Sequence, residues 1–127
     1  MRRSEQRRAA VFALYQQDVT GRAAAGQLDP TTRALTHELV DGVSAHREQI
    51  DALIEAHSRG WTLERIAPLE RNIMRVALFE MLHRSDIPDE VAIDEAIESA
   101  KELCGAEAPA YVNGVLGAVE RERMAPS

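Results

Sequence analysis

The fold is decided by Ile73-Met74-Arg75-Val76-Ala77-Leu78-Phe79-Glu80-Met81-Leu82, which is the most apolar stretch of the chain. As a helix, this stretch is apolar on nearly every side, and such a helix belongs in the interior of a bundle. Pro68 favours a helix start because proline is tolerated in the first turn, and residues 85–88 form a turn that ends the helix. Arg75 and Glu80 are predicted to be structural hydrogen-bonding groups, with Arg84 as the partner of Glu80 one turn on.

Helical spacing of apolar residues continues on both sides of this stretch, and no segment alternates apolar and polar residues as a strand does. Ser4 is predicted to cap the first helix, and Thr31 or Thr32 to restart the helical pattern after a connector over residues 21–30. The predicted helical segments, the second of them bent or broken near Gly42-Val43-Ser44, cover residues 4–19, 31–60, 63–66, 68–84, 89–104 and 110–123. The chain is therefore predicted to be an all-α protein of about seven helices.

The length and composition favour one compact domain. The chain has 127 residues, of which 45% are hydrophobic, enough for one core and too few for two large ones. No apolar stretch approaches the roughly 20 residues of a membrane span, and the N-terminus lacks an apolar signal core. The single cysteine, Cys104, excludes an internal disulfide. We expect a cytoplasmic protein that is bound to no membrane and holds no cofactor.

Charge is distributed unevenly along the chain. The formal net charge is −6, yet residues 1–17 hold four arginines and only one acidic residue, Glu5. Residues 85–107 show the opposite bias, because Lys101 is the only basic residue among eight acidic ones. This asymmetry predicts different partners for different faces.

Asp94, Glu98 and Glu102 form an acidic stripe, because residues four apart share one face of a helix. The stripe lies opposite the apolar positions Ile93 and Ile97, so it faces solvent and has no cleft in which a carboxylate would serve acid–base catalysis. Two alternatives remain: a solvated face, or a docking face for a basic protein that relieves the repulsion between like charges. No metal site is expected either, since His37-Glu38 lacks the second histidine of a zinc-protease helix.

The basic N-terminus is a candidate nucleic-acid contact. Arg2, Arg3, Arg7 and Arg8 can contact phosphates, and Tyr15, two turns after Arg8, can stack on a base. The alternative is an ordinary basic tail followed by a core tyrosine.

Asn113-Gly114 interrupts the apolar pattern of the last predicted helix. Glycine inside a helix costs about 1 kcal/mol relative to alanine. We expect close packing of Gly114 against another helix to compensate for that cost.

Five blocks of the sequence, taken together, carry a family resemblance. They are RRAAVFALYQ at residues 7–16, LVDGV at 39–43, RNIMRVALFE at 71–80, VAIDEAIESAK at 91–101 and YVNGVL at 111–116. In this order and at this spacing they resemble the NusB family of bacterial transcription antitermination factors. The match runs from about Arg3 to Val119, which is nearly the whole chain.

The resemblance implies a single NusB-like RNA-binding domain over residues 1–127. Its expected fold is two small three-helix bundles, an N-terminal lobe of about residues 1–60 and a C-terminal lobe of about 61–124. The implied function is not enzymatic: NusB-like proteins bind the boxA sequence of nascent ribosomal RNA with the ribosomal protein NusE, in a complex that keeps RNA polymerase elongating.

Site residues follow from the same resemblance. In the family, the arginine-rich N-terminus, a tyrosine of the first helix and the aromatic residue before Val-Asn-Gly contribute to RNA binding. Matched by position, the expected RNA-binding residues are Arg2, Arg3, Arg7, Arg8, Tyr15, Glu70 and Tyr111. NusE docks mainly on the C-terminal lobe, which favours the docking alternative for the acidic stripe of Asp94, Glu98 and Glu102.

Two alternative functions remain open. A NusB-like domain also forms the N-terminal part of certain ribosomal RNA cytosine methyltransferases, but these need a downstream cofactor domain, which we do not expect in a chain that ends at Ser127. The other alternative is a homodimeric interaction module without an RNA role.

Overall fold

The structure is a computed structural model that describes residues 2–24, 28 and 33–125. The described residues form six α-helices and a short 3₁₀ helix, and they contain no strand. The elements are α1 (Arg3–Thr20), α2 (Ala34–Ala45), α3 (Arg47–Ala56), η2 (Leu63–Arg65), α4 (Pro68–His83), α5 (Asp89–Leu103) and α6 (Ala108–Met124). The all-α prediction is confirmed.

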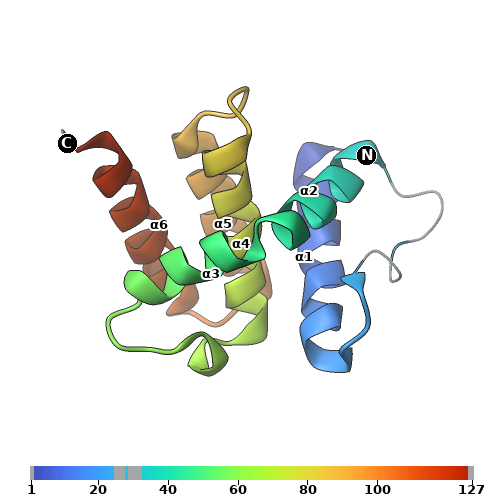
Figure 1. Cartoon of the computed structure of the whole chain (residues 1–127), viewed down its shortest axis with the longest axis horizontal. Helices are drawn as coiled ribbons and strands as arrows, with labels where there is room; N and C mark the ends of the chain where they lie inside the picture. Colours follow the sequence, from blue (N-terminus) through green and yellow to red (C-terminus); the bar gives the residue numbers. More distant parts are fainter. Residues whose placement is uncertain (1, 25–27, 29–32, 126–127) are drawn as a thin grey trace.

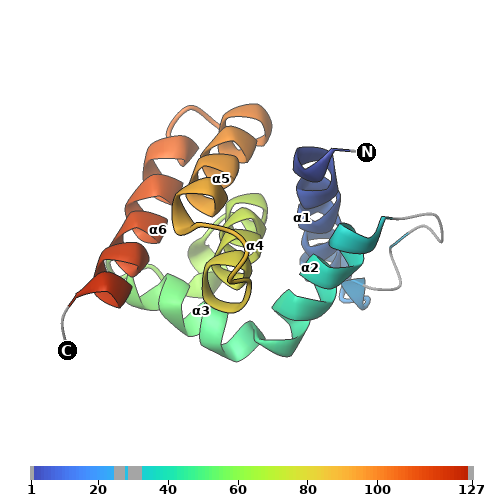
Figure 2. The same cartoon turned by 90° about the horizontal axis from the view of Figure 1, so that it is seen from above.

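The apolar stretch of the sequence forms the central helix, α4. Figures 1 and 2 show α4 between α1 on one side and α6 on the other. Every residue from Asn72 to Met81 is buried, and α4 packs against α1, α2, α3, α5 and α6. A helix with apolar side chains on nearly all sides is stable only where neighbours cover each side. The central position predicted for this stretch is therefore confirmed.

The helices fall into two groups that share α4. On one side α1 and α2 pack against each other and against α4, and on the other side α5 and α6 do the same, while α3 lies across α4 (Figure 2). Because α4 belongs to both groups, the lobe boundary near residue 60 stays a prediction.

Some predicted helix ends need correction. Helix α1 begins at Arg3 with Arg2 in the N-cap position, and Ser4 lies inside the helix, where its Oγ donates to Glu95 Oε1 at 3.2 Å. The prediction that Ser4 caps the helix is therefore wrong. Helix α6 begins at Ala108, two residues before the predicted start at residue 110, and Pro109 lies in its first turn, a position that needs no backbone N–H. Thr31 and Thr32, the predicted caps, lie outside the described residues, and α2 begins at Ala34.

The glycine in close contact with another helix is Gly42. A Cβ atom built on Gly42 would collide with the ring of Phe79, whereas one built on Gly114 would meet no atom within 4 Å. The prediction of close packing at Gly114 is therefore wrong, because this residue lies on the exposed side of α6. The break between α2 and α3 falls at His46, one turn after the predicted position.

A network of ion pairs joins α1, α3 and α4. Asp18 accepts hydrogen bonds from four side chains: Arg47 at 2.9 Å, Arg71 at 3.0 Å, Asn72 at 2.8 Å and Arg75 at 2.9 Å. Burial alone would raise the pKa of Asp18, but the Asn72 hydrogen bond and the charges of Arg75 and Arg71 outweigh it and lower that pKa. Arg75 also donates two hydrogen bonds to Asp51, so its predicted structural role is confirmed.

Candidate functional site

The first two arginines of the basic N-terminus are exposed. The Arg2 side chain is 84% exposed and forms one weak contact with Glu5, 3.5 Å from Nε to Oε1. Arg3 is exposed as well. An exposed ion pair of this kind adds little stability, so both guanidinium groups are accessible to an anionic ligand.

Arg7, by contrast, is buried. Its Nε donates to Glu80 Oε1 at 2.8 Å and its Nη2 to Glu80 Oε2 at 3.0 Å, with side chains only 7% and 1% exposed. Burial alone would lower the pKa of Arg7, but the hydrogen bond and charge of Glu80 raise it, so Arg7 stays charged. The prediction that Arg84 is the partner of Glu80 is wrong, because Arg84 lies at the end of α4 and pairs with Glu38 and Asp86.

Arg8 connects the basic N-terminus to the acidic stripe. Its Nη2 lies 3.0 Å from Oε2 of Glu102, and its buried Nε has no hydrogen-bond partner in the structure. The other stripe residues, Asp94 and Glu98, are exposed on α5. The basic N-terminus and the acidic stripe, which the sequence analysis predicts as separate surfaces, therefore meet where α1 lies beside α5.

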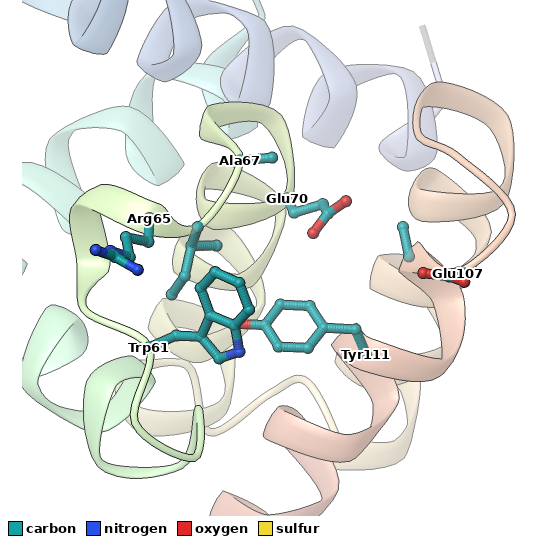
Figure 3. Close-up of a pocket in the computed structure, with 8 residues that line it drawn as sticks. Trp61, Arg65, Ala67, Glu70, Glu107 and Tyr111 are labelled. Carbon is teal, nitrogen blue, oxygen red and sulfur yellow. The ribbon is translucent and has the colours of Figure 1, made fainter.

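Tyr111 and Glu70 share an open hollow of about 330 Å³ (Figure 3). Tyr111 is half-buried at the start of α6, and its hydroxyl lies 3.0 Å from Oγ of Ser58. Burial raises the pKa of Glu70, which lies in the first turn of α4. Tyr15 is half-buried on α1 and does not line this hollow. Of the seven expected RNA-binding residues, only Glu70 and Tyr111 line this hollow.

Two further residues of the hollow are absent from the sequence predictions. Trp61 is 54% exposed, and Figure 3 shows its indole beside the Tyr111 ring, at the hydroxyl end of that ring. Arg65 of η2 lies on the other side of the indole, also at the rim. The signal in the sequence was a lone tryptophan directly after Gly60, where the helical pattern stops.

A second open hollow, of about 350 Å³, lies on the α6 side of Trp61. Trp61 and Tyr111 line both hollows and so form the wall between them. The other residues that line the second hollow come from the segment directly after α3 and from α6: His57, Ser58, Arg59, Ala110, Gly114, Val115, Ala118 and Arg121.

These features define a class of protein: a small all-helical protein in which two groups of helices share one central helix and the hollows are open to solvent. Within the described residues, no helix is long and apolar enough to cross a membrane. A comparison with known families is more specific, because the NusB family model matches residues 4–121. The chain belongs to the NusB family.

Individual relatives agree with this assignment. The transcription antitermination protein NusB of Rubrobacter xylanophilus is 45% identical in an alignment of 127 positions, which covers 94% of this chain and 91% of that protein. The solved structure of T. maritima NusB has a TM-score of 0.85 at 32% identity, covering 96% of this chain and 92% of that one. A chain in a crystal structure described as a plectonemic RNA supercoil has a TM-score of 0.88 at 26% identity, with full coverage of both. The family prediction is confirmed, and the protein is a non-catalytic antitermination factor.

Proposed function

We propose that the protein binds the boxA sequence of nascent ribosomal RNA together with the ribosomal protein NusE, in a cytoplasmic complex with elongating RNA polymerase. The main support for RNA binding is the hollow at Tyr111, where the exposed indole of Trp61 and the side chain of Arg65 lie beside the half-buried phenol of Tyr111. Aromatic faces stack on unpaired bases and arginines contact phosphates, so this arrangement suits a single strand. The similar chain in the RNA supercoil structure supports an RNA ligand.

The proposed RNA contacts differ from the sequence expectation at Arg7. The accessible members of the set are Arg2 and Arg3 at the N-terminus and Tyr111 in the hollow. Arg7 is proposed to hold α1 against α4 through Glu80 and so to position the residues beside it, without touching RNA. Tyr15 and Glu70 remain proposed RNA contacts. Arg8 can contact RNA only when its ion pair with Glu102 is broken.

The acidic stripe on α5 is the proposed docking face for NusE. Asp94 and Glu98 are exposed, and no ion pair among the described residues involves either of them. Ribosomal proteins are commonly basic, and complementary charge accelerates and orients association. The enzyme alternative fails, because the Rubrobacter protein that this chain matches over 91% of its length is an antitermination protein.

The test is a binding titration with labelled boxA RNA and a scrambled RNA of the same composition, each with and without NusE. We expect tighter binding to boxA than to the scrambled RNA, and a further gain when NusE is present. Replacing Arg2 and Arg3 by alanine should flatten the dependence of log affinity on log salt by about 0.7 per lost contact. Equal binding of both RNAs with and without NusE would contradict the proposal, and sedimentation of the protein alone would then test the homodimer alternative.

A further inference from the structure

Trp61 is held in an outward position by the local backbone. Arg59 has φ +47° and Gly60 has φ +86°, so the chain passes through two left-handed residues immediately before Trp61. The backbone N–H of Trp61 donates to the carbonyl of Ser58 at 3.2 Å, which closes the turn. A left-handed arginine is uncommon, and unusual backbone of this kind is concentrated at functional sites. Trp61 is 54% exposed after this turn.

Gly114 lines the second hollow. A Cβ at this position would meet no atom within 4 Å, so the glycine is not required for helix packing. Its cost to helix α6, about 1 kcal/mol relative to alanine, is therefore not offset by a neighbouring helix. What the missing side chain does provide is room beside Tyr111 and Trp61, in the hollow that these residues line.

The rim of the second hollow is cationic in a protein whose net charge is −6. Arg59 and Arg121 line it, and among the described residues no ion pair involves either side chain. The nearby carboxylate of Glu122 is engaged by His57, 2.7 Å from Oε2 to Nε2. The backbone carbonyl of Leu53 and Glu122 together raise the pKa of His57, which favours its cationic form. An anionic ligand is therefore attracted to this rim.

We propose that the hollow on the α6 side of Trp61 is a second base-binding site for single-stranded RNA. One strand then spans both hollows, with Trp61 between them as a stacking surface and with Arg59 and Arg121 at its phosphates. This inference rests on the proposed RNA-binding function and extends it to residues outside the expected set.

The experiment uses the fact that Trp61 is the single tryptophan of the chain. BoxA RNA is titrated into the full-length protein while the intrinsic fluorescence of Trp61 and the anisotropy of labelled RNA are recorded. We expect the fluorescence to be quenched with the same midpoint as the anisotropy change. Trp61→Ala should weaken binding by roughly 5- to 150-fold, which corresponds to the loss of one stacked base. Arg59→Gln together with Arg121→Gln should flatten the salt dependence by about 1.4.

Gly114→Leu fills the hollow and has a matched control. Gly105→Leu adds the same side chain at another glycine where a Cβ meets no atom, and Gly105 lines neither hollow. We expect weaker RNA binding for Gly114→Leu than for Gly105→Leu, with circular dichroism showing that both variants are folded. If Gly114→Leu does not fold, the titration of the Arg59→Gln, Arg121→Gln variant decides, because these two arginines line the second hollow and not the first.

The outcomes separate this inference from the proposed function. If the wild-type protein binds boxA no better than scrambled RNA in any condition, both fail. If it binds boxA specifically but Trp61 fluorescence is unchanged and the variants bind like wild type, the second site alone is refuted. Unchanged RNA affinity together with reduced NusE affinity would assign the hollow to the protein partner and also refute the inference.

Discussion

Replacing Arg7 by methionine tests whether this arginine is a structural residue or an RNA contact. The substitution removes the cation that makes two hydrogen bonds to Glu80, whose side chain is 1% exposed. A buried carboxylate left without its partner costs about 3–5 kcal/mol. Because each kcal/mol shifts the melting temperature of a domain of this size by about 4 °C, we expect a fall of roughly 12–20 °C.

The measurement is urea and thermal unfolding followed by circular dichroism, with Arg3→Met as the control. Arg3 is exposed, so its substitution should change the unfolding free energy by less than about 0.5 kcal/mol. Adding Glu80→Leu to Arg7→Met should recover most of the stability, since no unpaired charge is then buried. The reasoning would be refuted if Arg7→Met were as stable as wild type and yet bound boxA RNA more weakly, because Arg7 would then be a surface contact.

Other predictions follow from the same contacts. The pKa of Asp18 is lowered on folding, so its contribution to stability is present above the unfolded pKa of about 3.9 and is lost as pH falls through the lower folded pKa. In urea unfolding at several pH values, the stability difference between wild type and Asp18→Asn should therefore shrink below about pH 4, and a constant difference would contradict the assignment. Gly42→Ala should lower the unfolding free energy by about 1–3 kcal/mol, because the added methyl collides with an aromatic ring of α4; an unchanged melting temperature would show that the ring can move aside. Glu102→Gln should free Arg8 and steepen the salt dependence of RNA binding by about 0.7, whereas Glu98→Gln should not, and equal slopes would mean that the ion pair does not restrain Arg8.

Local patterns in the sequence were sufficient for the helices. The apolar surface of α4 and the starts at Pro68 and Asp89 depend on neighbouring residues alone, and the structure has them where they were predicted. Side-chain pairing was less predictable, since it depends on which helices cross. Glu80 was assigned to Arg84, four residues on, but its partner is Arg7, 73 residues away. A helical pattern does not predict which face of α4 packs against α1.

The candidate site shows the same limit. Tyr111 and Glu70 were brought together by family resemblance, and the structure places them in one hollow. Trp61 was missed because the end of a helical pattern indicates where a helix stops and not where the next side chain points. Gly42 and Gly114 look alike in the sequence, yet one meets a ring and the other meets open space, and this difference depends on tertiary packing.

The contact between Arg8 and Glu102 makes the basic N-terminus and the acidic stripe parts of one system. A basic protein docked on α5 would compete with Arg8 for Glu102, and each arginine that leaves the pair becomes available to a phosphate. Coupling of this kind is reciprocal, because the factor by which the partner raises RNA affinity must equal the factor by which RNA raises partner affinity. An exposed ion pair is worth at most about 1 kcal/mol, so this route supplies roughly a five-fold effect. If RNA and NusE are the two ligands, as proposed, a coupling much larger than about five-fold between them would require contacts beyond this ion pair.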